Sequence, residues 1–346
     1  METLWFALLT FMLCMYAVLD GFDLGAGSLH LILAKSEEER RIILNSIAPL
    51  WDGNEVWLIA AGGTMFFAFP LLYSSSFSGF YLPLMIVLWL LMLRGLGIEF
   101  RHQVHHPIWR SFWDAVFSVS SLLLALFLGA ALGNVVRGVP LGKDGYFFEP
   151  LWTTFTVVPD AGILDWFTLL MGLVTCSTLA VHGATFLAIK SEGGLRERSR
   201  SIASAAWWLM LSTSLAALVA VSSIRQGIWD NYMLHPWGII FPLGGLLGLA
   251  GNRICLRRGS DRAAFFCSSL FIFSMLSSTA FGLYPALLPS SIDPRDTLTV
   301  QSAAAHGSTL ATGLPWWIAG MSLVGAYFVF VYRMFRGKAT SGEGGY

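Results

Sequence analysis

The segment Asn45-Ser-Ile-Ala-Pro-Leu-Trp-Asp-Gly-Asn-Glu-Val-Trp57 places two carboxylates, Asp52 and Glu55, at the start of an apolar run that continues to about residue 72. A charged side chain inside a bilayer costs on the order of 2.5 to 3.5 kcal/mol on insertion scales, so it usually faces a partner or a water path instead of lipid. The segment therefore predicts a membrane helix whose entrance is acidic for a functional reason.

The composition is that of a polytopic membrane protein. Hydrophobic residues make up 55% of the chain and charged residues 12%, the net charge is zero and the mean hydropathy is +0.66. Soluble domains carry roughly 25% charged residues, and the neutral balance gives no reason to expect a nucleic-acid partner. Nine apolar runs come close to the roughly 20 residues that a membrane helix needs. We therefore predict an all-α fold with nine transmembrane helices, at about 4–33, 54–72, 77–98, 112–133, 163–189, 201–222, 237–254, 263–288 and 314–334.

The distribution of Lys and Arg predicts the orientation. Sixteen of the 21 basic residues fall in loops on one side, four fall on the other side, and Arg94 lies inside the third run. By the positive-inside rule the N-terminus is outside and the C-terminus is cytoplasmic. No basic stretch precedes the first apolar run, so we expect this run to stay as a helix.

The first and fifth runs resemble each other when offset by 162 residues, which aligns Cys14 with Cys176 and Gly21 with Gly183. A parallel repeat would divide the chain into two four-helix bundles plus one peripheral helix. The units would be 1–133 and 163–288, joined by an outward loop at 134–162 and followed by the ninth helix at 314–334. Shared membrane composition is the simpler alternative.

Asp20-Gly-Phe-Asp-Leu-Gly-Ala-Gly27 is expected to interrupt the first helix. Asp20 and Asp23 are three residues apart and share one helix face, while Gly21 and Gly25 form a small-x-x-x-small pair that lets another helix approach closely. The sequence thus places buried carboxylates and a close helix contact at one level.

Arg94 is the expected counter-ion, because a buried guanidinium must be paired. We expect it to meet Asp20, Asp23, Asp52 and Glu55 near the cytoplasmic face. An excess of acid over base is a condition for loading and releasing protons near neutral pH, and a purely structural ion-pair cluster is the alternative. Asp52 could instead complement the dipole of the helix that follows Pro49.

The other polar residues predict no cofactor bound by this chain. His30 and His182 are the histidines within predicted spans, and a lone helical histidine is more often a hydrogen-bonded core residue than a ligand. His102, His105 and His106 are expected to form a solvated turn and not a metal site, and the four cysteines to be free, buried thiols. Haem-binding membrane subunits need axial His, Met or Cys ligands in the bundle. Redox cofactors would therefore lie in another subunit.

Several motifs resemble subunit II of the cytochrome bd-type quinol oxidases. They are Asp20-Gly-Phe-Asp-Leu-Gly25, Arg40-Arg-Ile-Ile-Leu-Asn-Ser-Ile-Ala-Pro49, Trp51-Asp-Gly-Asn-Glu-Val-Trp-Leu58, Phe77-Ser-Gly-Phe-Tyr81 and Gly133-Asn-Val-Val-Arg-Gly-Val-Pro140. The resemblance implies a bacterial inner-membrane oxidase that oxidises quinol and reduces oxygen to water. It places the haems, two of b type and one of d or b type, in the partner subunit I, with which subunit II forms a heterodimer. A structural quinone and a small accessory helix are further partners that it allows.

In the resembled family the aspartate of the Trp-Asp-Gly-Asn motif is implicated in the proton path, and this residue is Asp52 here. We therefore expect Asp52 to relay protons, Glu55, Asp20 and Asp23 to support it, Trp51 to shape the path and Arg94 to balance the charge. A proton-coupled secondary transporter with an acidic site at a broken first helix is the competing class.

Overall fold

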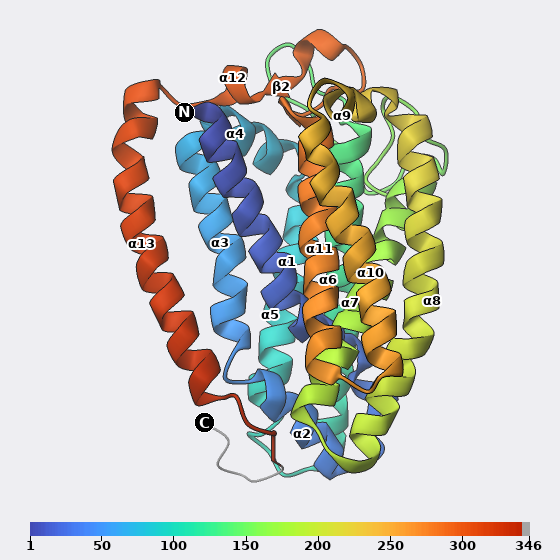
Figure 1. Cartoon of the computed structure of the whole chain (residues 1–346). Helices are drawn as coiled ribbons and strands as arrows, with labels where there is room; N and C mark the ends of the chain where they lie inside the picture. Colours follow the sequence, from blue (N-terminus) through green and yellow to red (C-terminus); the bar gives the residue numbers. More distant parts are fainter. Residues whose placement is uncertain (341–346) are drawn as a thin grey trace.

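Long helices standing side by side make up most of the protein (Figure 1). The computed structural model describes residues 1–340. Eight of the helices in this part of the chain are long and apolar enough to cross a membrane. They are α1 (Glu2–Leu33), α5 (Tyr81–Phe100), α6 (Pro107–Arg137), α7 (Trp166–Lys190), α8 (Gly193–Ile224), α10 (Ile240–Arg257, with the preceding turn η2, Pro236–Ile239), α11 (Asp261–Leu283) and α13 (Gly307–Met334).

Helix α3 (Trp51–Ala68) occupies the place of the predicted second span and lies beside α1 (Figure 1). Its first turn carries Asp52, Asn54 and Glu55, which lower its hydropathy below that of the eight other helices. The helix ends at Ala68 because Pro70 keeps the preceding residue, Phe69, out of the helical conformation. The chain then continues as the short helix α4 (Pro70–Gly79).

Shorter elements close the two ends of the bundle. The end near the N-terminus carries α4, η1 (Gln226–Trp229), α9 (Asp230–Leu234), η3 (Pro294–Asp296), α12 (Val300–Ala303) and an antiparallel pair of strands, β1 (Ala286–Leu288) and β2 (Leu298–Thr299). The opposite end carries α2 (Glu37–Ile47). The predicted eighth span, 263–288, was too long at its end: α11 stops at Leu283, because Tyr284 precedes Pro285 and the chain turns into β1.

The prediction that Asp20–Gly27 interrupts the first helix was wrong, because α1 is continuous from Glu2 to Leu33. The glycines serve helix packing instead. A Cβ atom on Gly25 would lie 2.0 Å from the carbonyl oxygen of Leu179 in α7, and one on Gly183 would lie 2.3 Å from the carbonyl carbon of Gly25. Helices α1 and α7 thus touch backbone to backbone, as the small-residue spacing predicts.

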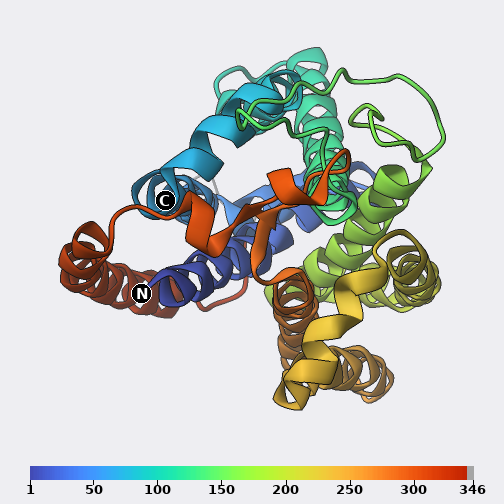
Figure 2. The ribbon, with the colours of Figure 1, turned by 90° about the horizontal axis from the view of Figure 1, so that it is seen from above.

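The helices at the edges of the bundle expose apolar side chains. Seen from above, α13 lies at one edge near α1, and α8 and α10 lie at the other side (Figure 2). Trp316, Leu323 and Phe330 of α13 are exposed, as are Val219 of α8 and Leu247 of α10. Such faces suit lipid or another membrane subunit, and not water.

Candidate functional site

Three helices bring the predicted acidic residues together in the half of the bundle that holds the C-terminus of α1. Asp20 and Asp23 lie on α1, Glu55 lies in the first turns of α3, and Arg94 lies near the end of α5. Asp20, Asp23 and Arg94 are buried and Glu55 is partly buried. The spacing of three between the two aspartates does place both toward the neighbouring helices.

Arg94 pairs with two carboxylates. Its Nη1 donates to Oδ1 of Asp20 over 2.7 Å and its Nη2 donates to Oε2 of Glu55 over 2.7 Å. Asp20 is therefore the aspartate that meets the arginine. The side chains of Arg94 and Asp20 are 1% and 0% exposed, whereas that of Glu55 is 20% exposed. The arginine therefore pairs with one fully buried carboxylate and one partly exposed carboxylate.

Asp23 is held by the amide of Asn54, which in turn accepts from a tyrosine, and the sequence analysis singled out neither residue. Asn54 donates from Nδ2 to Oδ2 of Asp23 over 2.7 Å, and Tyr332 of α13 donates its hydroxyl to Oδ1 of Asn54 over 3.0 Å. The chain of contacts links α1, α3 and α13. Asn54 stands inside the quoted Trp51–Trp57 motif, so its position in the motif was the available signal. Tyr332 offered none.

The cluster carries more acid than base. One guanidinium faces Asp20, Asp23 and Glu55, and Oδ2 of Asp20 and Oδ1 of Asp23 make no hydrogen bond within residues 1–340. An unpaired buried carboxylate charge is costly. Binding a proton at one of these oxygens removes that cost, which makes the cluster chemically suited to hold a proton.

Asp52 lies apart from this network. Its side chain is exposed and it makes no hydrogen bond with the described part of the chain. The N-cap of α3 is Leu50, and no side chain caps the helix by a hydrogen bond, so Asp52 can act on α3 only through its charge in the first turn. Trp51 lies over Arg94, with 6.0 Å between the guanidinium carbon and the ring centroid.

A second buried network surrounds Asp114 of α6. It accepts from His30 Nε2 over 2.6 Å, from Arg40 Nη1 over 2.9 Å and from Arg101 Nε over 2.6 Å. Glu37 in turn accepts from Arg101 over 2.9 Å. This network ties α2 to α1, α5 and α6, and cations outnumber Asp114 around it.

The remaining histidines and the cysteines have structural surroundings. His182 is hydrogen-bonded at both ring nitrogens, to Ser268 over 2.8 Å and to the carbonyl of Val18 over 2.9 Å. His105 meets Arg110 over 2.6 Å, and His106 caps α6. The four cysteines are free, as predicted, but the prediction that all are buried was wrong, because Cys14 is buried and the other three are only partly buried at the helix surfaces. Within residues 1–340 no group of three or more His, Cys, Asp or Glu side chains could hold a metal ion.

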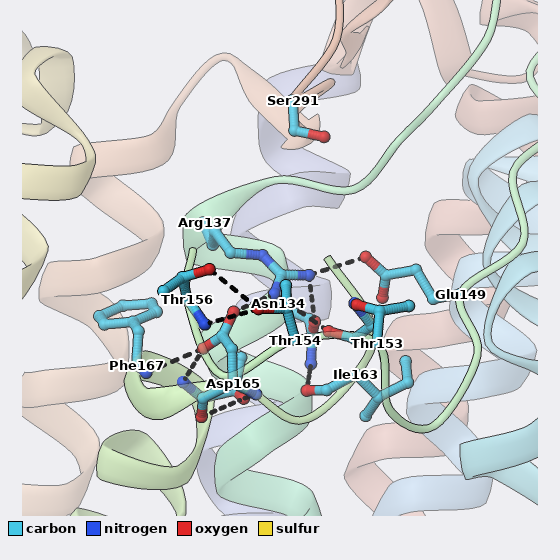
Figure 3. Close-up of polar contacts among 12 residues, drawn as sticks. Asn134, Arg137, Glu149, Thr153, Thr154, Thr156, Ile163, Asp165, Phe167 and Ser291 are labelled. Carbon is cyan, nitrogen blue, oxygen red and sulfur yellow. Dashed lines mark hydrogen bonds and ion pairs between the residues drawn. The ribbon is translucent and has the colours of Figure 1, made fainter. Parts of the chain in front are cut away.

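A third polar cluster fixes the long loop at the opposite end of the bundle (Figure 3). Arg137 donates from Nη2 to Glu149 over 2.8 Å and to Asn134 over 2.6 Å, and Nη1 pairs with Asp165. Asp165 also caps α7 through the amides of Phe167 and Thr168. Burial, only partly offset by Arg137, raises the pKa of Glu149 to about 8. The single guanidinium group of Arg137 therefore pairs with two carboxylates, Glu149 and Asp165.

Comparison with known proteins gives consistent matches along the whole chain. A sequence model of the family described as cytochrome bd terminal oxidase subunit II matches residues 1–335. The chain is 33% identical to a probable cytochrome oxidase subunit 2 of Haemophilus influenzae, over 97% of this chain and 94% of that protein. It is 32% identical to the cytochrome bd-I ubiquinol oxidase subunit 2 of Escherichia coli strain K12, with the same coverage, and 28% identical to the cytochrome bd ubiquinol oxidase subunit 2 of Bacillus subtilis, over 96% and 97%.

The fold also matches a solved structure, the bd oxidase from Geobacillus thermodenitrificans. The TM-score is 0.74, with 16% identity over 96% of this chain and 98% of that chain. At this identity the likeness concerns the fold.

Proposed function

This chain belongs to the cytochrome bd terminal oxidase subunit II family and is therefore an obligate subunit of a respiratory quinol oxidase, and we propose that its acidic cluster supplies protons for oxygen reduction. The observation that carries the proposal is a gradient of burial along one set of carboxylates. Asp52 is exposed, the side chain of Glu55 is 20% exposed and that of Asp20 is fully buried. Arg94 forms ion pairs with both Glu55 and Asp20. Such a series connects the surface to the bundle interior.

We place the entrance of this series in the cytoplasm. The bundle end that carries α2 and the loops after α5, α7 and α10 holds the sixteen basic residues, and the positive-inside rule assigns this end to the cytoplasm. The N-terminus is then outside. With α3 counted as a span, the subunit has nine transmembrane helices. The two four-helix units and the peripheral ninth helix stay a prediction.

In this proposal the residues have separate tasks. Asp52 receives protons from water, and Glu55 takes them one helix turn deeper. Arg94 keeps Glu55 and Asp20 near each other and balances part of their charge, while Trp51 covers the guanidinium from the entrance side. Asp20 and Asp23 are the buried acceptors at the inner end of the series, and one oxygen of each makes no hydrogen bond within residues 1–340.

The haems of the oxidase belong in the partner subunit I, two of b type and one of d or b type. The two histidines inside the helix bundle do not fit axial ligation. His182 uses both ring nitrogens inside the fold, and His30 uses Nε2 for Asp114. No step of the proposed proton supply therefore passes through a group bound by this chain.

The partner would cover the exposed apolar side of α3. Val56, Ile59 and Phe66 are exposed there, on the side of the helix that carries Asp52. Covering this side would enclose the acidic entrance between the subunits, so that protons leave the Asp20 and Asp23 region toward the partner. The secondary transporter alternative is not favoured, because α1 is continuous and the family is that of an oxidase subunit.

Asp52→Asn tests the relay in the purified heterodimer. We expect normal haem absorption and assembly, because the side chain makes no hydrogen bond within residues 1–340, and a fall in quinol oxidase turnover of about 10²-fold, typical of losing a positioned proton-transfer group. Asp160→Asn, which removes an exposed carboxylate in the loop at the other end, is the matched control. Unchanged turnover in Asp52→Asn would remove Asp52 from the path, and loss of haem would make its role structural.

A further inference from the structure

A basic cavity lies at the bundle end that holds the C-terminus of α13. Its volume is about 490 Å³, and its lining includes Arg196, Arg262, Arg336, Lys338 and Asp261. Hydrogen bonds fix one wall of the cavity in place. Lys190 donates to the carbonyls of Phe335 and Gly337, the amide of Ala339 donates to the carbonyl of Lys190 over 2.9 Å, and Lys338 donates to the carbonyl of Ser191 over 2.8 Å. These bonds hold the segment after α13 against the end of α7.

The positive charge of this cavity is not neutralised by its own acid. Asp261 accepts from Arg196 over 2.7 Å and from Arg200 over 2.6 Å, so its charge is already shared by two guanidinium groups. Arg262 and Arg336 make no hydrogen bond or ion pair with any residue in the range 1–340. Burial and then the nearby Arg196 lower the pKa of Lys338. Within residues 1–340 the lining of the cavity therefore carries more positive than negative charge.

An apolar groove of about 610 Å³ continues from the cavity along α13. It is lined by Ala326, Val329, Phe330 and Met334 with Arg333, and it shares Arg336 with the basic cavity. From Met334, the last residue of α13, to Ala326 the helix rises roughly 12 Å at 1.5 Å per residue, so the groove extends from the end of a membrane-spanning helix toward the middle of the bilayer. The basic cavity and the apolar groove are thus adjacent, and Arg336 lines both of them.

We propose that this composite site binds an anionic phospholipid, with its phosphate and headgroup in the basic cavity and one acyl chain along the α13 groove. Charge complementarity decides the occupant: two guanidinium groups without an internal partner favour a negatively charged headgroup over a zwitterionic one. The apolar groove favours a lipid over a free anion. The inference does not depend on the proton-supply proposal, because it uses none of the residues assigned to proton transfer.

The experiment compares two charge-matched variants of the purified heterodimer. Arg262→Gln with Arg336→Gln removes the two unpartnered guanidinium groups of the cavity. Arg257→Gln with Arg258→Gln removes the same charge from exposed residues at the end of α10, which do not line the cavity. Haem absorption and turnover check that each complex is assembled. Native mass spectrometry of the delipidated complex, titrated with phosphatidylglycerol and with phosphatidylcholine, measures the bound lipid.

We expect the wild type to prefer phosphatidylglycerol and the cavity variant to bind it about 30-fold more weakly, because each basic residue near an anionic lipid is worth a factor of about five. The control variant should bind as the wild type does. An equal loss in the control, or no preference for phosphatidylglycerol in the wild type, would overturn the site. Displacement of the lipid by millimolar inorganic phosphate would also overturn it and make the cavity a free-anion site.

Discussion

Glu149→Gln should remove a pH dependence from the anchoring of the loop between α6 and α7. Glu149 is fully buried and shares the guanidinium of Arg137 with Asp165. Its pKa in the folded protein is about 8, against an ordinary value of 4.5. The folded protein therefore favours the protonated form of Glu149. The loop is most firmly anchored below pH 4.5, and anchoring weakens as the pH rises toward 8.

The structure gives the size of this effect. A pKa that moves from 4.5 to about 8 corresponds to about 5 kcal/mol between fully protonated and fully ionised Glu149. Between pH 5 and pH 8 the free energy of opening the loop should fall by about 1.4 kcal/mol per pH step. Above pH 8 the carboxyl is ionised in both states, so the curve should become flat.

Hydrogen exchange of the loop amides measures this slope. The amides of Ile163 and Leu164 donate to the carbonyls of Pro150 and Leu151 over 2.9 Å and 3.1 Å, so they report on loop closure. Protection factors, normalised to the intrinsic exchange rate at each pH, should fall about tenfold per pH step from 5 to 8 in the wild type. In Glu149→Gln they should stay level, because the amide mimics the protonated acid.

Asp144→Asn is the control, because Asp144 is an exposed carboxylate of the same loop. It should keep the slope of the wild type. The reasoning fails if Glu149→Gln keeps the slope as well, or if the wild-type loop becomes more protected as the pH rises.

Two further variants test the packing and the charge balance of the bundle. Gly183→Val should prevent stable assembly of the heterodimer, measured as haem-containing complex per cell, because its side chain would overlap the backbone of Gly25. Gly320→Val, where a Cβ meets nothing within 4 Å, should assemble normally. Arg94→Gln should lower the unfolding free energy by about 3 to 5 kcal/mol, measured by thermal unfolding, since Asp20 loses its buried counter-ion. Assembly of Gly183→Val at wild-type yield, or an unchanged unfolding temperature of Arg94→Gln, would contradict the contacts described.

The helices were predictable because the length of an apolar run is a direct requirement of the bilayer. The residues at which the helices begin and end were less predictable. Helix α8 begins at Gly193, eight residues before the predicted start, because its basic first turns project beyond the apolar part. The glycines after Asp20 look like a helix break in sequence, yet they allow contact with α7, and this partner helix is 158 residues away in the chain at the Gly25 and Gly183 crossing.

The candidate site also contains residues that the sequence predicts and residues that it does not. Asp20, Asp23, Glu55 and Arg94 could be foreseen, because a fixed helical spacing and the need to pair a buried guanidinium bring them together. Tyr332 could not, because its contact with Asn54 depends on how α13 leans on α3. Glu149 could not either, because an irregular loop has no periodicity that marks a buried position.

The sign of the charge excess separates the three buried clusters. Around Asp114 two arginines and His30 meet one buried carboxylate, and both oxygens of this carboxylate accept hydrogen bonds, so it has no reason to bind a further proton. Around Arg94 and Arg137 carboxylates outnumber the guanidinium, and each cluster has a carboxylate oxygen without a hydrogen bond in the described chain. Of these two clusters, the Arg94 cluster lies at the end rich in basic loops, and its partly exposed member Glu55 stands one helix turn from the exposed Asp52. A carboxylate excess and a graded exposure to water coincide there, which is why we propose proton supply for the Arg94 cluster and loop anchoring for the Arg137 cluster.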